Sequence, residues 1–111
     1  MKSKYKNVKT EYDGHKFDSK KEAIRYAELK ALQLAGEIDG LELQPRFELV
    51  PKVRWNNRTL RKREYVADFK YYEVYLSRWV VEDVKGYRTD VYKLKRSLFL
   101  FNYPEYLFRE S

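Results

Sequence analysis

Three charged residues in the second half of the chain have the types and spacing needed for chemistry on a phosphodiester. Asp83 and Lys85 are two positions apart in a segment rich in Val, so on a strand their side chains project from the same face. A hairpin with the preceding strand, symmetric about the bond between Tyr75 and Leu76, places Asp68 opposite Asp83. Two opposed carboxylates repel unless a cation lies beside them. We therefore expect a divalent cation at Asp68 and Asp83, with Lys85 orienting a water or stabilising charge on the phosphate.

Each of these residues also has a purely structural explanation. Asp83 and Lys85 could form an ion pair on a solvated strand. Glu22 follows Ser19 by three positions, the spacing of a capping box, so it could bond back to the helix start; alternatively it could lean toward the sheet as a third carboxylate ligand. Glu82 has the opposite parity to Asp83, so we expect it on the other face and rank it lower as a ligand.

The composition limits the classes of partner and of metal ion that the protein could bind. The chain has 24 Lys and Arg against 17 Asp and Glu, a net charge of +7, which favours a polyanion such as nucleic acid or an acidic membrane. There is no Cys and only one His, His15, which follows a predicted turn and is expected at the surface. A Cys/His zinc site is therefore excluded, and any metal bound by oxygen atoms would be Mg²⁺ or Mn²⁺.

Membrane association is disfavoured by the distribution of apolar and basic residues. No apolar run reaches the roughly 18 residues that span a bilayer, and no apolar stretch of signal-peptide length follows the basic start. The basic residues do not form one strongly amphipathic face. We expect a soluble, intracellular protein.

Periodicity and turn signals predict a mixed α/β chain. Residues 1–9 read as a flexible basic arm and residues 10–111 as one domain. Turn and cap signals place a hairpin around Asp13-Gly14 and a helix over 20–35 that ends at Gly36. The remaining predicted elements are an edge or bulged strand over 41–50 broken at Pro45, paired strands over 64–73 and 78–86, a helix from Thr89 to about 101 with Leu94, Leu98 and Phe101 on its core face, and a last strand over 106–109.

The densest positive charge lies between the strands over 41–50 and 64–73. Residues 51–64 read as a polar loop with a turn at Asn56-Asn57. This loop is the best candidate for DNA contact outside the catalytic residues, through Arg58, Arg61, Lys62 and Arg63.

Asp68 followed by Asp83-Val84-Lys85, with a glutamate on an earlier helix, resembles the PD-(D/E)-x-K nuclease superfamily. That superfamily has a restriction-endonuclease-like α/β core of a helix, a three-stranded antiparallel stretch, a helix and a final strand. The stretches FDSKKEAIRYAELK, LELQPRFEL, YVADFKYY and VVEDVKGYRTDVYKLKRSLF are similar to a phage and prophage family of small proteins associated with Holliday junction resolvases. Ala67 stands where the motif has proline, a change that touches no metal ligand.

The resemblance implies Glu22, Asp68 and Asp83 as ligands of Mg²⁺, with Mn²⁺ as a substitute, and Lys85 as the catalytic lysine. Gln44 would touch the site or only satisfy the backbone at the break before the proline. The helix after the motif would hold a phosphate through residues that are otherwise solvated: Thr89, Lys93, Lys95 and Arg96.

The activity implied is a metal-dependent endonuclease that makes paired cuts in four-way DNA junctions. A junction has near two-fold symmetry, so a homodimer is expected, in the cytoplasm of a bacterial host and with no small-molecule cofactor. Two alternatives stay open. One is a nuclease with the same chemistry on duplex, nicked or flap DNA; the other is a non-catalytic DNA-binding accessory protein of phage replication.

Overall fold

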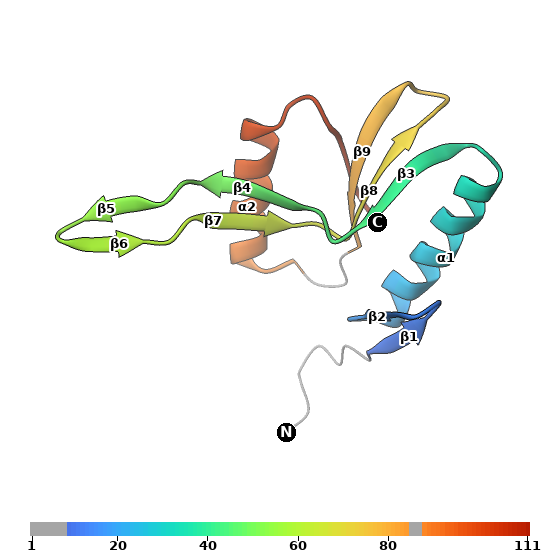
Figure 1. Ribbon diagram of the computed structural model, residues 1–111, viewed down its shortest axis with the longest axis horizontal. Helices are drawn as coiled ribbons and strands as arrows, with labels where there is room; N and C mark the ends of the chain where they lie inside the picture. The colour runs from blue at the N-terminus through green and yellow to red at the C-terminus, as the bar shows by residue number, and fades with distance from the viewer. Residues whose placement is uncertain (1–8, 85–87) are drawn as a thin grey trace.

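The computed structural model describes residues 9–84 and 88–111, which form a mixed α+β fold of two helices and ten short strands (Figure 1). The predicted basic arm lies outside the described residues apart from Lys9. In chain order the elements are β1 (Thr10–Tyr12), β2 (His15–Phe17), α1 (Lys20–Leu34), β3 (Ile38–Leu43), β4 (Arg46–Val50), β5 (Val53–Trp55), β6 (Arg58–Leu60), β7 (Arg63–Val66), β8 (Phe69–Glu73), β9 (Arg78–Asp83), α2 (Asp90–Asn102) and β10 (Leu107–Glu110).

A four-stranded sheet in the order β10-β9-β8-β3 forms the centre of the molecule. Strands β8 and β9 are antiparallel and pair from Phe69 with Glu82 to Glu73 with Arg78, which confirms the predicted hairpin symmetry. Strand β3 adds antiparallel to β8, while β10 returns after α2 and runs parallel to β9. The predicted end of the second strand at Gly86 lies outside the described residues.

The two helices cover opposite faces of this sheet. Alternate residues of β9 enter different cores: Val80 packs with Tyr26 and Leu29 of α1, whereas Val81 packs with Phe99 of α2. Figure 1 shows α1 and α2 on either side of the central strands. Side chains at successive positions of β9 therefore face different helices, and this decides the surroundings of the acidic residues at its end.

Helix α1 begins and ends as the sequence predicts. The Ser19 hydroxyl accepts a hydrogen bond from the Glu22 amide at 3.1 Å, which is the first half of a capping box. At the other end Gly36 has φ +80°, and its amide donates to the Gln33 carbonyl at 3.0 Å. The next amide, that of Glu37, reaches the Leu32 carbonyl at 3.0 Å and completes a Schellman motif.

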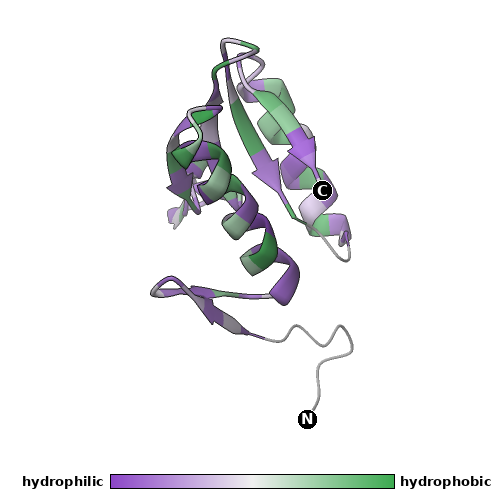
Figure 2. Cartoon of the chain, turned by 90° about the vertical axis from the view of Figure 1, so that its right-hand side faces the viewer, coloured by the Kyte–Doolittle hydropathy of each residue, from purple (hydrophilic) through white to green (hydrophobic). Residues whose placement is uncertain are grey.

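The buried face of α1 is narrower than the sequence predicts. The apolar pattern of residues 20–35 predicts a broad buried stripe that includes Ile24 and Leu34 as well as Ala23, Tyr26 and Leu29. Ala23, Tyr26 and Leu29 are buried, but Ile24 and Leu34 are exposed. Among the described residues, α1 packs mainly against β3 of the central sheet and against the small β1–β2 hairpin, which leaves the Ile24 and Leu34 side of the helix uncovered. Figure 2 shows that hairpin as largely hydrophilic.

The two strands predicted over 41–50 and 64–73 are each divided in two. The backbone bends at Gln44, which has φ +51°, and the Pro45 carbonyl accepts from the Ala67 amide at 3.1 Å. Beyond this point β4 and β7 pair with each other and leave the central sheet. The break before Pro45 was predicted, whereas the break at Ala67 and Asp68 was not, because nothing in their own sequence interrupts a strand.

The segment predicted as a polar loop is a second hairpin. Strands β5 and β6 pair in regular register, and Asn56 and Asn57 have φ of 51° and 60°, which confirms the predicted turn and gives it the geometry of type I′. Together β4, β5, β6 and β7 form a two-stranded ribbon: β4 and β7 pair beside α2, and β5 and β6 continue the ribbon beyond both helices (Figure 1).

The core face of α2 differs from the prediction. Tyr92 and Phe99 are buried, whereas Leu94 and Phe101 are 62% and 83% exposed. Leu98 is partly buried, as expected. Because β4 and β7 pack against the side of α2 that carries Phe99, with the Phe47 and Phe99 ring centroids 4.9 Å apart, aromatic contacts rather than the leucine pattern decide which side of the helix is buried.

Neither helix in the described part of the chain is long and apolar enough to cross a membrane.

Candidate active site

Asp68 occupies the break between β7 and β8, where the chain passes from the ribbon into the central sheet. Its amide donates to the Glu82 carbonyl at 3.2 Å, and its carbonyl accepts from the Gln44 amide at 2.9 Å. Its carboxylate Oδ2 accepts from the Val84 amide at 2.6 Å. Asp68 is therefore fixed through its backbone and its side chain beside the end of β9.

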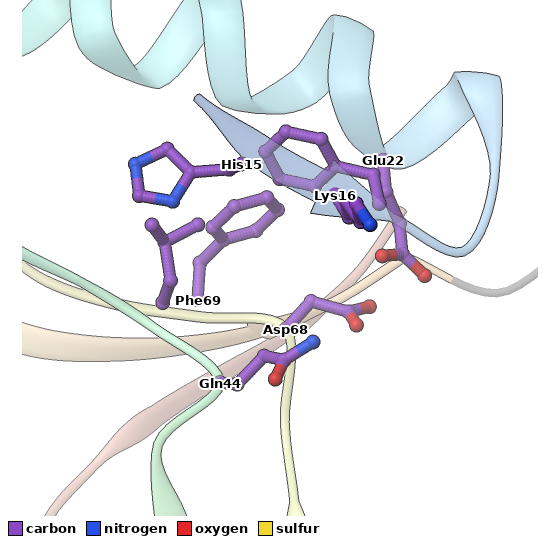
Figure 3. Close-up of a pocket in the computed structure, with 8 residues that line it drawn as sticks. His15, Lys16, Glu22, Gln44, Asp68 and Phe69 are labelled. Atoms are coloured by element: carbon purple, nitrogen blue, oxygen red, sulfur yellow. The ribbon is translucent and has the colours of Figure 1, made fainter. Parts of the chain in front are cut away.

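A small open pocket of about 120 Å³ lies in front of Asp68. Figure 3 shows the carboxylates of Glu22 and Asp68 pointing toward one another in this pocket, with the Gln44 amide beside Asp68 and the Lys16 side chain near Glu22. The pocket is formed by β2, the first turn of α1, the end of β3 and the start of β8, and its lining residues are His15, Lys16, Phe17, Glu22, Leu43, Gln44, Asp68 and Phe69.

The β1–β2 hairpin brings two residues to the pocket that sequence reasoning did not place there, His15 and Lys16. Tyr26 of α1 holds the hairpin, because its hydroxyl donates to the Asp13 carboxylate at 2.7 Å and its ring lies 5.2 Å from that of Phe17. The hydrogen bond to Asp13, with some burial, raises the pKa of Tyr26 to about 12. His15 is exposed as predicted, yet it lines the pocket, at the end away from the carboxylates of Glu22 and Asp68. One signal in the sequence could have placed His15 here: His15 is two positions before Phe17 on a short strand, so the two side chains share a face.

Glu22 serves the site and the helix start at the same time. Its amide is the group capped by Ser19, and its side chain is buried at the pocket. The Ser19 cap uses the backbone amide of Glu22, and the carboxylate lies at the pocket; the predicted bond from that carboxylate back to the helix start stays a prediction.

Asp83 is fully buried at the end of β9, with 0% of its surface exposed. Its carboxylate accepts a hydrogen bond from the Tyr65 hydroxyl of β7. Burial, followed by the nearby charge of Asp83, raises the pKa of Tyr65 above its ordinary value. Asp83 is not among the lining residues of the pocket in the described part of the chain, although the next amide, that of Val84, contacts Asp68.

The donor atoms at the pocket suit a hard divalent cation. Two carboxylates and one amide side chain are present, all with oxygen donors of the kind Mg²⁺ and Mn²⁺ prefer. Within residues 9–84 and 88–111, no three His, Cys, Asp or Glu side chains are gathered closely enough to hold a metal ion. The structure therefore joins Glu22 with Asp68 at the pocket, whereas the Asp83 carboxylate contacts Tyr65 on the side of β9 that packs against α2, and the full ligand set stays a prediction. Lys85 lies outside the described residues.

Glu82 lies on the opposite face of β9 from Asp83, as its parity predicts, and is not among the residues that line the pocket. It is 1% exposed and accepts hydrogen bonds from Arg25 at 2.5 and 3.0 Å, from the Tyr71 hydroxyl at 2.6 Å and from the Ser111 hydroxyl at 3.1 Å. Burial alone would raise the pKa of Glu82, but these hydrogen bonds and the Arg25 charge lower it. Glu82 therefore links α1, the sheet and the end of the chain.

The residues predicted to hold phosphate on α2 have different roles in the structure. Thr89 caps the helix by accepting from the Tyr92 amide at 3.0 Å. Arg96 donates to the Glu110 carboxylate at 2.8 Å and lies over the Tyr92 ring. Lys93 is exposed, and Lys95 is half-buried. The helix end is thus formed as predicted, while the guanidinium of Arg96 is engaged within the fold.

Glu110 gives the fold an acid-sensitive contact. Burial favours its neutral form, but hydrogen bonds from Tyr92, Arg96 and Arg88 outweigh burial and lower the pKa of Glu110 to about 2, from an ordinary value of 4.5. Its folded carboxyl binds a proton less readily than the unfolded one. The stability it contributes is therefore fully present above pH 4.5 and is lost as the pH falls toward 2.

We expect the difference in unfolding free energy between the wild type and Glu110→Gln to be constant near neutrality and to shrink on acidification. Urea titrations at a series of pH values between 4.5 and 2 measure it. Arg96→Met, which removes one of the donors, should reduce the same pH dependence. A difference that does not change with pH would contradict the assignment.

Comparison with known proteins gives the family but no activity. The family model described as "Protein of unknown function (DUF1064)" matches residues 2–109, so the chain belongs to the DUF1064 family. No curated protein and no solved structure matches the chain.

Proposed function

We propose that this protein is a divalent-metal-dependent DNA endonuclease that resolves four-way junctions as a homodimer. The observation that carries the proposal is the meeting of Glu22 and Asp68 in one pocket, next to the end of the strand that carries Asp83. These residues come from α1, from the break between β7 and β8, and from β9, and a bound cation would stabilise two carboxylates that converge at a surface pocket.

The element order supports the same proposal. Along the chain α1 is followed by the antiparallel strands β3, β8 and β9, then by α2 and the parallel strand β10. This is the order of the restriction-endonuclease-like core that the resemblance implies, with the ribbon inserted between β3 and β8. We therefore propose that the fold is a small member of that class.

In the proposed reaction each residue has a separate task. Glu22 and Asp68, completed by Asp83, would hold Mg²⁺, which when bound lowers the pKa of a coordinated water and polarises a phosphate oxygen. Gln44 and Lys16 lie at the rim, where an amide and an ammonium group can orient a phosphate. Lys85 would stabilise the negative charge that develops on the phosphate.

A magnesium titration with a synthetic four-way junction tests the function directly. We expect paired, symmetric cuts that need Mg²⁺ or Mn²⁺ and that are much slower on linear duplex, nicked and flap DNA of the same sequence. Equal cutting of linear duplex would reject the junction preference but keep the nuclease. Junction binding without any metal-dependent cutting would instead favour the non-catalytic accessory protein.

The two roles of Glu22 can be separated by a pair of substitutions. Glu22→Gln keeps the amide that Ser19 caps but removes the charge, so we expect cleavage to fall by about 100-fold or more, which corresponds to roughly 3 kcal/mol of lost transition-state stabilisation. Ser19→Ala removes the cap and should cost about 1 kcal/mol of stability with cleavage retained. Cleavage rates and urea unfolding measure both. The opposite pattern would make Glu22 a capping residue only.

A further inference from the structure

The two-stranded ribbon is the most basic part of the molecule. Residues 51–63 contain six Lys and Arg and no Asp or Glu, and all of them are exposed. Figure 1 shows the β5–β6 end extended beyond the helices and the central sheet. An isolated two-stranded hairpin is only marginally stable in water, because it has no third strand or helix to cover it. A charged surface of one sign on such an arm indicates a polyanionic partner rather than an internal packing role.

The two faces of the ribbon tip differ. The register pairs Val53 with Leu60 and Trp55 with Arg58, so these four side chains share one face, and Arg54 and Thr59 share the other. Trp55 is 56% exposed, and the Arg58 guanidinium lies over its ring, 5.1 Å from the centroid. The first face therefore combines exposed apolar groups with a cation that is already positioned.

We propose that this ribbon enters the major groove of duplex DNA with the Trp55 and Arg58 face toward the bases. The major groove is roughly 12 Å wide and admits a two-stranded β-ribbon without distortion of the duplex, whereas β-strand proteins that bind the minor groove, roughly 6 Å wide, bend the DNA. Arg58 can reach guanine edges and Trp55 can contact thymine methyl groups. The cations nearer the base of the ribbon, Arg61, Lys62 and Arg63, are exposed and can reach phosphates along the groove; Lys62 Nζ also lies 3.9 Å from the Glu64 carboxylate.

This placement would anchor one duplex arm of the junction while the pocket at Asp68 contacts the DNA backbone. From Pro51 to the turn the ribbon spans about 20 Å at 3.3 Å per residue, enough to reach the groove floor with the rest of the chain outside the helix. The inference rests on the proposed function only in taking DNA as the ligand, since groove binding needs neither the metal nor the carboxylates.

Salt-dependent binding tests the role of the ribbon. With the full chain, a short labelled duplex and EDTA to prevent cutting, Arg58→Ala/Arg61→Ala should weaken binding by about 10-fold. It should reduce the slope of log K against log salt by about 1, because Arg61 is placed at a phosphate and Arg58 at the bases. Lys30→Ala/Arg78→Ala removes the same charge from α1 and β9 and should leave the slope nearly unchanged. Equal losses in both double variants would overturn the proposal, because net charge alone would then explain binding.

Competition with ligands that bind one DNA groove provides a second test, in which the protein keeps all of its charged residues. In a Trp79→Phe background Trp55 is the single tryptophan, and its fluorescence should change when duplex binds. Methyl green, a major-groove ligand, should reverse the change, and netropsin, a minor-groove ligand, should not. Competition by netropsin alone, or tighter binding to the single strand than to the duplex, would reject the groove assignment.

The two proposals fail in different ways. Absence of metal-dependent cutting by the wild type would reject the nuclease and leave the ribbon result intact. Unchanged DNA binding by Arg58→Ala/Arg61→Ala would reject the ribbon even if the wild type cuts DNA.

Discussion

Asp68→Asn is expected to reduce magnesium-dependent cleavage of a four-way junction by about 1,000-fold or more. A metal ligand at the reacting phosphate contributes several kcal/mol to the transition state, and each 1.4 kcal/mol is about tenfold in rate. The variant should fold normally, because Asn keeps a side-chain oxygen that can accept from the Val84 amide, now at 2.6 Å from Asp68 Oδ2. Cleavage rates under single-turnover conditions measure the effect.

Glu42→Gln is the matched control for this loss of charge. Glu42 lies exposed on β3, and its substitution also removes one carboxylate. We expect it to cut at the wild-type rate, and both variants to bind the junction as tightly as the wild type in EDTA. Wild-type cleavage by Asp68→Asn would remove Asp68 from the site and with it the observation on which the proposed function depends.

Glu82→Ala should lower the free energy of unfolding by about 3 kcal/mol. Breaking a buried ion pair leaves the remaining partner uncompensated, and here Arg25, with 24% of its side chain exposed, would lose its main carboxylate. The Tyr71 and Ser111 hydroxyls would lose their acceptor as well. Urea unfolding measures the change as a lower midpoint with an unchanged slope.

Glu28 offers an internal comparison, because it is the second carboxylate bound to Arg25. It lies at 3.1 Å from the guanidinium but is 57% exposed, so Glu28→Ala should cost less than about 0.5 kcal/mol. If the two substitutions cost the same, burial would not be the reason that Glu82 matters. A cost at Glu82 also separates its structural role from catalysis, since it lies on the face opposite Asp83.

The parts of the site that belong to the central hairpin could be predicted from the sequence. The register of β8 and β9 and the opposite orientations of Glu82 and Asp83 follow from strand periodicity and a short connection. The capped start of α1 and the turn at Asn56-Asn57 were equally readable, because each depends on a few neighbouring residues.

Only the tertiary structure decided which carboxylates meet. Asp68 accepts from the Val84 amide and faces Glu22 across a pocket, while Asp83 bonds to Tyr65, a residue that no local signal connected with it. The break at Asp68 depends on the bend at Gln44, because β3 and β4 pair with the two halves of the divided strand. Such pairing is a property of distant segments.

The sequence and the tertiary structure therefore each determine a different part of the candidate site. By itself the sequence determined the residue types, their parity on each strand and the positive charge between the strands, since these need only local geometry and composition. The fold decided that the N-terminal hairpin would add His15 and Lys16 to the pocket and that the basic segment would be a projecting ribbon. Contacts between elements far apart in the chain depend on packing, which local patterns do not encode.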